Sequence, residues 1–436
     1  MSAPSRSLSP PAAFDPGAVT GRVVVPLRIG FSWSFVGWVV YAACQWLMLS
    51  VLAKLGSPLL VGQFAFGMAI CAPVFMLTNL QLRGVQSTDA LNEYGFADYV
   101  SLRALSSAVA VIVIAVACPF LKLGWLATMV VLLVAVFKCL ESFGDVIAGL
   151  MQKFEMLDSA AIALLLRGIA SLAAFGAGFA MFRNLPLALV FWIVSAGIVI
   201  GSYDFRVARR LASAEGGMTC GLRWQTLRTL AITSLPLGLV SAISSLSVNL
   251  PRYTIERVLS VSELGIFASL AYPVTAATII ANSLGQSALA RLSRLFAEGH
   301  TEAFKKLLFK LIGCGVVLGT GLVVAVAGWG SRILTILYTP EYGKQGSLFV
   351  MLALTAGLNA IASFLVYALT AARQFTIQLP ISLVCMVTTL VCSVFLVPRY
   401  RLPGAAMALI CSALVLIATA SITLGRAIAK RSEGRR

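Results

Sequence analysis

The sequence predicts an all-α integral membrane protein with about twelve transmembrane helices, arranged as two pseudo-symmetric lobes of six. Composition, the spacing of apolar runs and the distribution of basic residues lead to this prediction. Of the 436 residues, 59% are hydrophobic and 11% are charged, and the mean hydropathy is +0.94. Soluble domains carry roughly 25% charged residues because their surfaces face water. Lipid must therefore surround most of this chain.

The apolar runs have the length of membrane-spanning helices, which need about 20 mostly apolar residues. Six runs precede a basic linker at 206–227, and six follow it. Their predicted bounds are 29–52, 62–82, 102–121, 125–149, 159–181 and 185–205, then 228–250, 264–289, 307–328, 345–370, 375–397 and 403–425. The segment Ser331–Tyr338 is a candidate for a short helix at the membrane interface. The loops between runs are too short to fold into separate domains.

The basic residues predict the orientation. With the amino terminus in the cytoplasm, 21 of the 33 Lys and Arg residues fall on the cytoplasmic side and 9 on the outer side. Because basic residues gather in cytoplasmic loops, this bias indicates an even number of spans with both termini inside. The expected organisation is a cytoplasmic tail at 1–28, a lobe at 29–205, the cytoplasmic linker at 206–227, a lobe at 228–425 and a basic cytoplasmic tail at 426–436.

The composition also excludes several classes of protein. The net charge of +17 is spread between apolar runs rather than gathered in one patch, so a nucleic-acid partner is not expected. The chain has one histidine, His300, and nine cysteines without a CxxC spacing, so neither a metal site nor a disulfide framework is predicted. Nothing indicates a cofactor. Residues 1–28 lack the short apolar core and cleavage site of a secretory signal peptide.

An internal repeat accompanies the division into two lobes. The second span opens Gly62-Gln-Phe-Ala and reaches Ala72-Pro73-Val, while the eighth opens Gly265-Ile-Phe-Ala and reaches Tyr272-Pro273-Val. Aligning the two segments requires a gap of three residues. Repeated halves of this kind can rock against each other around a central cavity, which gives alternating access to the two sides of a membrane.

The chain resembles a known family along most of its length. The stretches that carry the resemblance are Phe31–Trp46, Lys54–Pro58, Ala72–Arg83, Glu141–Asp145 with Gln152-Lys153, Pro251–Arg257, Glu263–Phe267, Leu337–Tyr342, Leu369–Arg373 and Val397–Ala406. Their order and spacing resemble the polysaccharide (O-antigen, Wzx-type) flippases. These belong to the superfamily (MOP exporters) that also contains the multidrug MATE antiporters and the lipid II flippase. Members often carry Gly where Arg401 stands and Pro near Ala290, so helix-end geometry differs there.

The resemblance implies a MATE-like fold, location in the bacterial inner membrane and a monomeric state. It implies translocation of undecaprenyl-diphosphate-linked oligosaccharide from the cytoplasmic to the periplasmic leaflet by alternating access. The translocated unit would serve the biosynthesis of a surface polysaccharide such as O-antigen, capsule or exopolysaccharide. No enzymatic activity is implied. Membrane lipids are implied partners, and the polysaccharide polymerase and chain-length machinery are candidate partners.

Charged residues inside spans are the first candidates for a mechanism, because each costs roughly 2.5–3.5 kcal/mol on insertion scales. Lys138, Glu141 and Asp145 fall on one face of the fourth span. Arg167, on the antiparallel fifth span, is expected level with Glu141. Lys138 and Arg167 are candidate diphosphate ligands, and Glu141 and Asp145 are candidates for coupling to a proton or cation. A mutually neutralising structural cluster is the alternative.

Two further arginines are candidate diphosphate ligands. Arg83 ends the second span on the predicted cytoplasmic side, where it would either receive the substrate or reach lipid headgroups. Arg252 lies near the outer end of the seventh span, where pairing with Glu256 or Glu263 is the alternative to drawing the substrate outward. The candidate hinges are the prolines within predicted spans, Pro73, Pro236, Pro273 and Pro380, because proline removes a backbone hydrogen bond and permits a kink. Plain bending is the alternative reading for them.

Three other functions remain to be weighed. A cation-coupled multidrug or small-solute exporter of the MATE type would share the fold, but basic residues facing inward argue against a cavity for cationic drugs. A lipid II flippase usually has two further helices, for which there is no room after Gly425. A polysaccharide polymerase or ligase needs a catalytic constellation on a sizeable outer loop, and the outer loops here are short.

Overall fold

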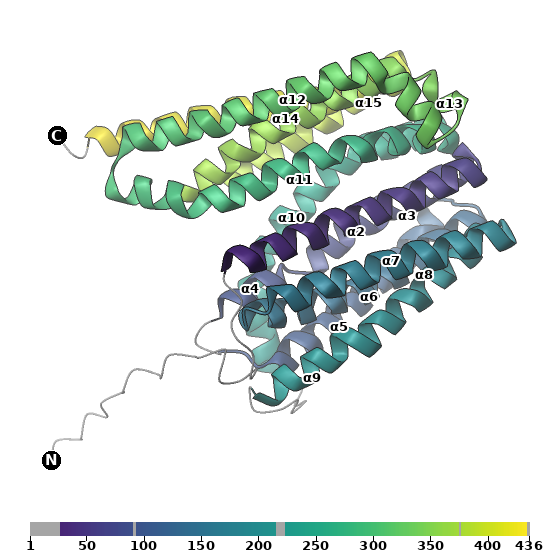
Figure 1. Ribbon diagram of the computed structural model, residues 1–436, viewed down its shortest axis with the longest axis horizontal. Coiled ribbons are helices and arrows are strands. Elements are labelled where there is room, and N and C mark those ends of the chain that lie inside the picture. The colour runs from purple at the N-terminus through teal and green to yellow at the C-terminus, as the bar shows by residue number, and fades with distance from the viewer. Residues whose placement is uncertain (1–26, 90–92, 215–222, 375, 434–436) are drawn as a thin grey trace.

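A computed structural model describes residues 27–89, 93–214, 223–374 and 376–433 of the chain (Figure 1). In these ranges all regular secondary structure is helical. Eleven described helices are long and apolar enough to cross a membrane. The predicted tail at 1–26, the centre of the predicted linker at 215–222 and the last residues, 434–436, lie outside the described ranges.

The first lobe follows the predicted spans closely. Its elements are α2 (Leu27–Leu55), α3 (Pro58–Thr78), α4 (Leu82–Thr88), α5 (Phe96–Phe120), α6 (Trp125–Lys153), α7 (Leu157–Phe182), α8 (Leu185–Val199), the π-helical turn η1 (Ile200–Asp204) and α9 (Phe205–Ala214). Ser57 and Asn184 cap α3 and α8 with their side-chain oxygens, and a proline stands in the first turn of each helix. These are the residue types that begin helices. The first residues of the predicted linker, up to Ala214, are helical.

The second lobe contains α10 (Trp224–Val258), α11 (Val261–Glu298), α12 (Thr301–Leu337), α13 (Pro340–Gly343), α14 (Gly346–Ala371) and α15 (Gln378–Glu433). The expectation of a separate interfacial helix at Ser331–Tyr338 is wrong. The long helix α12 continues without a break to Leu337, since no proline interrupts its hydrogen bonds.

The helix α15 crosses the molecule twice. Arg401 has φ 57° and ψ −135° in the middle of it, between Pro398 and Pro403. A Cβ atom on Gly404 would meet the carbonyl oxygen of Leu396, which shows that the chain turns back on itself here. Counting α15 twice confirms the twelve predicted crossings. The backbone angles at Arg401 explain why glycine suits this position, because glycine alone adopts them without steric strain.

The two lobes lie side by side along their length (Figure 1). We call the end at which α2 begins and α15 finishes the near end, and the opposite end, which carries α13, the far end. The ribbons of α2 and α11 approach each other at the far end and diverge toward the near end (Figure 1). A membrane-spanning segment must satisfy its own backbone hydrogen bonds, which is why every crossing is a helix.

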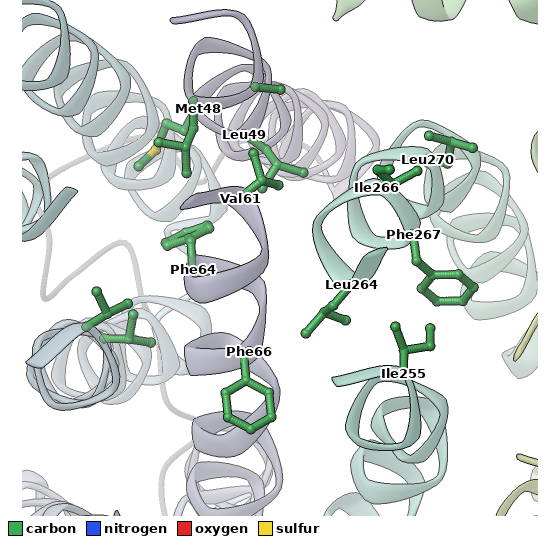
Figure 2. Packing of buried hydrophobic residues seen from close by; sticks show 14 of the residues in the cluster. Met48, Leu49, Val61, Phe64, Phe66, Ile255, Leu264, Ile266, Phe267 and Leu270 are labelled. Atoms are coloured by element: carbon green, nitrogen blue, oxygen red, sulfur yellow. The ribbon is translucent and has the colours of Figure 1, made fainter. Parts of the chain in front are cut away.

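The described residues form four buried hydrophobic clusters, and the three largest explain this shape. The largest contains residues of both lobes, among them Phe64 and Val61 of the first and Leu264 and Phe267 of the second. Figure 2 shows these side chains on the neighbouring helices α3 and α11: Leu264 points toward α3, whereas Phe64 and Phe267 point away from the opposite helix. Toward the near end the cores are separate: one lies within the first lobe with the start of α10, the other within the second lobe. Apart from the first half of α10, the buried apolar clusters of the described residues join the two lobes at the far end.

The helix α10 crosses from one lobe to the other. Near its start, Leu227 and Leu230 are fully buried in the near-end core of the first lobe. Gly238 packs so closely on α3 that a Cβ atom there would lie 2.7 Å from the carbonyl oxygen of Leu77. Farther along, α10 packs on α15, and the hydroxyls of Ser247 and Thr389 are 3.2 Å apart. The first turns of α10 therefore belong structurally to the first lobe.

The internal repeat has a counterpart at the far end. Gly62 and Gly265 each stand four residues after the first residue of their helices, Pro58 of α3 and Val261 of α11. A Cβ atom on Gly62 would meet the carbonyl oxygen of Val261, and one on Gly265 would meet that of Pro58. The two helices thus approach each other reciprocally at equivalent glycines, as small residues allow in membranes.

Candidate functional site

Lys138 and Glu141 meet on the face of α6, as expected. The Lys138 ammonium lies 2.6 Å from the Glu141 carboxylate, one helical turn away. Tyr41 of α2 donates a hydrogen bond of 2.6 Å to the other oxygen of the same carboxylate. The side chains of Lys138 and Glu141 are 20% and 27% exposed. In this group, Tyr41–Glu141–Lys138, the Lys138 ammonium therefore lies inside the protein with its charge neutralised by Glu141.

Arg167 takes a different direct partner from the one expected. It lies within electrostatic range of Glu141, but its guanidinium contacts the Asp204 carboxylate at 2.5 Å, with exposures of 5% and 1%. Asp204 is the last residue of the π-helical turn η1. Such turns insert an extra residue and redirect side chains. Gly144 leaves the space for this pair, because a Cβ atom there would lie 2.6 Å from the Arg167 guanidinium carbon.

Asp145 holds two arginines toward the near end. Arg83 of α4 approaches its carboxylate to 3.3 Å, and the fully buried Arg103 of α5 approaches to 3.9 Å. Arg103 also donates a hydrogen bond of 2.5 Å to Asn79, which accepts a second bond of 2.9 Å from Ser142. Arg83 follows a break in the helix, where Leu80 and Gln81 have positive φ angles. It is thus engaged in a structural network, with its side chain 24% exposed.

The expected cluster of four charges is therefore distributed over three groups. Lys138 and Glu141 are together, Arg167 pairs with Asp204, and Asp145 binds Arg83 and Arg103. Reasoning from the sequence missed Arg103 and Asp204 as parts of the charged interior. Both stood at the edges of predicted spans, where a charge is normally assigned to the headgroup region. Arg103 carries the charge opposite to that of Asp145, and Asp204 carries the charge opposite to that of Arg167. This match in sign, at the same level of neighbouring spans, was the signal available in the sequence.

A small cavity lies between the lobes. Its volume is about 100 Å³, and its lining includes Phe64 and Met68 of α3, Asn249 and Arg252 of α10, and Tyr272 of α11. Arg252 donates a hydrogen bond of 3.1 Å to Asn249. Arg252 and Lys138 each lie within electrostatic range of the Tyr272 hydroxyl. The structure therefore brings cations of the two lobes to the same region of the interface, which the sequence could not place together.

The cavity is closed toward the far end. The Trp46 indole of α2 donates a hydrogen bond of 2.8 Å to the Tyr338 hydroxyl, which donates one of 2.8 Å to the Ser269 carbonyl of α11. Nearby, the Tyr253 hydroxyl donates to the carbonyl of Ala69. These contacts and the shared apolar core seal the lobes together. Toward the near end the ribbons of α2 and α11 diverge (Figure 1), and the buried apolar clusters of the two lobes are separate there.

Three of the four candidate hinges lie inside helices. Pro73, Pro236 and Pro273 interrupt α3, α10 and α11, the helices that contact the opposite lobe. Pro380 does not interrupt a helix. It stands in the first turn of α15, which begins at Gln378, where proline removes no helical hydrogen bond. Pro251 also interrupts α10, close to Arg252.

The arrangement is suited to electrostatic recognition. Among the described residues, no group of three or more His, Cys, Asp or Glu could hold a metal ion. What the geometry offers is a set of buried and partly buried ion pairs in the first lobe, and Arg252 in the lining of a cavity between the lobes. Such an interior can hold an anionic group away from bulk water and release it when the lobes move.

Comparison with known proteins agrees with this architecture. No family model matches the chain. The chain is 28% identical over 389 residues to the capsular polysaccharide biosynthesis protein CapF of Staphylococcus aureus, a match that covers 89% of this chain and 96% of CapF.

Several solved structures share the fold. A variant of the Vibrio cholerae MATE transporter VcmN has a TM-score of 0.62 at 11% identity, covering 93% of this chain and 96% of that one. A multidrug resistance MATE transporter in an inward-facing conformation has a TM-score of 0.64 at 10% identity, covering 96% and 98%. A MOP superfamily transporter of Pyrococcus furiosus, described as having a binding pocket of reversed polarity, has a TM-score of 0.65 at 12% identity, covering 97% and 98%.

These findings confirm the resemblance noted in the sequence. The fold is that of the MATE transporters, with two lobes of helices, and the protein is a multi-pass membrane protein. The similarity to a polysaccharide biosynthesis protein fits a polysaccharide flippase of the MOP superfamily.

Proposed function

We propose that this protein is a flippase. Its substrate is an oligosaccharide repeat unit linked to undecaprenyl diphosphate, which it moves from the cytoplasmic to the periplasmic leaflet by alternating access. The translocated unit then serves the synthesis of a surface polysaccharide. Membrane lipids surround the protein in the inner membrane, and the polymerase and chain-length machinery act on its product.

Two independent similarities support this proposal. CapF is named for capsular polysaccharide biosynthesis, whereas the solved structures of the same fold are transporters. A transporter within polysaccharide biosynthesis has a clear task. The repeat unit is assembled on a lipid at one face of the membrane and is used at the other, so its sugar head must cross.

The convergence of Lys138 and Arg252 carries the proposal. One cation comes from each lobe: Arg252 lines the cavity between the lobes, and Lys138 lies within electrostatic range of Tyr272 in the lining of the same cavity. A diphosphate needs positive charge along its path, since an unpaired anion is costly in a low-dielectric interior. A site shared by the lobes can also be taken apart when they rock. Lys138 would exchange Glu141 for the diphosphate during this movement.

The size of the cavity supports a movement of the lobes. At about 100 Å³ it holds no oligosaccharide in the closed part of the interface. The near end must therefore receive the sugar head before the contacts at the far end separate. Pro73, Pro236 and Pro273 lie in the helices that must bend or rotate for this change.

The near end is the cytoplasmic side in this proposal. It carries both ends of the described chain (Figure 1) and most of the basic residues between spans. The positive-inside rule assigns such a side to the cytoplasm. The conformation described above is then inward-facing, ready to take up a substrate assembled in the cytoplasmic leaflet.

The test uses a strain in which the gene for this protein is deleted. Undecaprenyl lipids are extracted and measured by mass spectrometry, and membrane vesicles are probed with an impermeant sugar-modifying enzyme. A complete lipid-linked oligosaccharide is expected to accumulate in the cytoplasmic leaflet. The intact protein is expected to relieve this accumulation, and the double variant Lys138→Ala/Arg252→Ala, produced at equal levels, is expected not to.

A matched control separates the role of the site from a general loss of charge. Lys310→Ala removes a cation from an exposed position on α12, so it is expected to complement the deletion fully. If the deletion strain accumulates no intermediate and keeps its surface polysaccharide, the flippase proposal is wrong. If the double variant complements as well as Lys310→Ala, the proposed diphosphate path is wrong.

A cation-coupled exporter of the MATE type is the second candidate, because some of the structures with this fold are multidrug transporters. The same strain distinguishes the two functions. An exporter predicts increased sensitivity to cationic drugs in the deletion strain, with normal lipid-linked intermediates. For either function, Glu141 is the better candidate for coupling to a proton or cation. Asp145 is less suited because two arginines already hold its carboxylate.

A further inference from the structure

A second, larger cavity lies at the near end of the second lobe, away from the interface between the lobes. Its volume is about 970 Å³, and it is bounded by α11, the turn between α14 and α15, and the last turns of α15. Three arginines line it: Arg294, Arg373 and Arg431. Among the described residues that line it, none is acidic. The proposed function makes no use of this cavity.

Two of these arginines are available to a ligand, and one of the two is held in place. The Arg431 guanidinium donates a hydrogen bond of 2.5 Å to the Ala297 carbonyl and lies 4.7 Å from the ring centre of Phe296. These contacts fix its position without neutralising its charge. Arg373 follows α14 with a positive φ of 56°, and its side chain is exposed. A fixed guanidinium beside an exposed one suits a phosphate group.

Arg294 contributes less charge. Its Nε atom lies 2.8 Å from the Glu298 carboxylate. The hydrogen bond from Arg294 keeps the pKa of Glu298 below its ordinary value, so this carboxylate stays ionised and neutralises its partner. Arg373 and Arg431 therefore remain as the net positive charge of the cavity.

The rest of the cavity is apolar, and it lies at the level where spans end. Leu289 and Phe296 of α11, Ala371 of α14 and Ala427 of α15 form its walls. Leu289 and Ala371 are the last residues of their spans, and Ala427 lies close to the end of its own. A cationic rim over apolar walls at this depth matches a phospholipid, whose phosphate lies just outside its acyl chains. Basic pockets between transmembrane helices bind anionic headgroups in this way.

We infer that this cavity is a binding site for an anionic phospholipid. Arg373 and Arg431 hold the headgroup phosphate, and the upper part of an acyl chain lies against Leu289 and Phe296. The site is separate from the diphosphate path, so it can be tested without any transport assay. A bound lipid would bridge α11, α14 and α15 and stiffen the near end of the second lobe.

Native mass spectrometry of the purified full-length protein tests this inference. The protein in detergent is titrated with phosphatidylglycerol and, separately, with phosphatidylcholine, and bound lipids are counted. One phosphatidylglycerol is expected to bind more tightly than the rest and more tightly than phosphatidylcholine. Arg373→Gln/Arg431→Gln is expected to weaken that first binding by about thirtyfold, the order of effect for losing two basic contacts to an anionic headgroup.

The control variant Arg291→Gln/Lys306→Gln removes the same charge from exposed positions at the same end of the same lobe, outside the cavity lining. It is expected to bind phosphatidylglycerol like the unchanged protein. Thermal unfolding without added lipid checks that both variants are folded. Equal binding by the two double variants would overturn the inference. Displacement of the lipid by millimolar inorganic pyrophosphate, with pyrophosphate binding tightly by itself, would also overturn it in favour of a soluble phosphate ligand.

Discussion

The two lobes share an architecture but differ in where they keep their charges. The ion pairs described for the first lobe join Lys138 to Glu141, Arg167 to Asp204, and Asp145 to two arginines, all among packed helices. Those described for the second lobe lie at helix ends, such as Arg294 with Glu298 and Arg401 with Glu263. Buried pairs are costly to break, whereas exposed ones contribute little.

This difference indicates a division of labour between repeated halves. In the proposed mechanism the first lobe carries the electrostatic machinery, because it holds Arg167–Asp204, the one described ion pair in which both side chains are buried. The second lobe contributes Arg252 and Tyr272 to the interface, together with the lipid-binding cavity at its near end. The packing glycines Gly62 and Gly265 stand at equivalent positions of α3 and α11, whereas the described buried ion pair lies in the first lobe.

The largest effect on stability is expected from Arg167→Leu. This change leaves the Asp204 carboxylate, 1% exposed, without its partner, and removing one member of a buried pair costs about 3–5 kcal/mol. Thermal unfolding of the purified protein in detergent measures the loss. The double variant Arg167→Leu/Asp204→Leu is expected to recover most of it, because no buried charge remains.

The matched change in the second lobe sharpens the comparison. Arg294→Leu removes an arginine that is 79% exposed and pairs within one helix, so its effect on the unfolding temperature is expected to be far smaller than that of Arg167→Leu. Equal losses from Arg167→Leu and Arg294→Leu would contradict the idea that the first lobe holds the structurally important charges.

Gly144→Ala is expected to have the next largest effect. The added methyl would contact the Arg167 guanidinium, and overpacking of this kind costs about 1–3 kcal/mol. Gly176→Ala in α7 is the control, because a Cβ atom there meets nothing within 4 Å. The control is expected to leave the unfolding temperature unchanged or slightly raised. If Gly176→Ala is as unstable as Gly144→Ala, the loss of stability in Gly144→Ala does not come from contact with the Arg167–Asp204 pair.

Trp46→Phe tests the closure between the lobes. It removes the hydrogen bond to Tyr338, with an expected loss of about 0.5–1.5 kcal/mol from the closed far end. Hydrogen–deuterium exchange is expected to increase at the end of α12, around Ile333–Leu337. Trp329→Phe, at an exposed position on the same helix, is the control. Unchanged exchange in Trp46→Phe would show that apolar packing alone keeps the far end closed.

Arg401→Gly is expected to have the smallest effect. Glycine relieves the backbone at φ 57° but loses the contact of 2.7 Å with Glu263, made by an arginine that is 65% exposed. The two changes oppose each other, so the net effect is expected to stay below about 1 kcal/mol. Arg401→Ala loses the ion pair without relieving the backbone and should be less stable than Arg401→Gly. The reverse order, measured by thermal unfolding, would contradict this reading of the turn.

The number and placement of the spans were predictable, and the pairing of the charges was not. A span must satisfy its backbone internally and match the bilayer, so the length of an apolar run locates it within a few residues. The pairing of Lys138 with Glu141 also follows from helical periodicity. In contrast, the partner of Arg167 depends on a π-helical turn at Ile200–Asp204, which no local residue pattern announces.

Long-range packing limited the prediction in a second way. The convergence of Lys138 and Arg252, and the cavity near Arg431, depend on how whole helices cross, which the periodicity of one helix does not determine. Pro380 shows the same limit at short range. A shift of a few residues in the start of α15 places this proline in a first turn rather than a helix interior.

The path of α10 has a consequence for how the protein is made. Leu227 and Leu230 complete the near-end core of the first lobe, yet they follow the last helix of that lobe along the chain. Because synthesis proceeds from the amino terminus at about 5–20 residues per second, the first lobe leaves the ribosome with this core uncovered. The core of the first lobe is complete only after the first turns of α10 have been synthesised and have packed against it. Maturation of the two halves is therefore interlocked, and a nascent first lobe would be exposed to quality-control proteases until α10 is inserted.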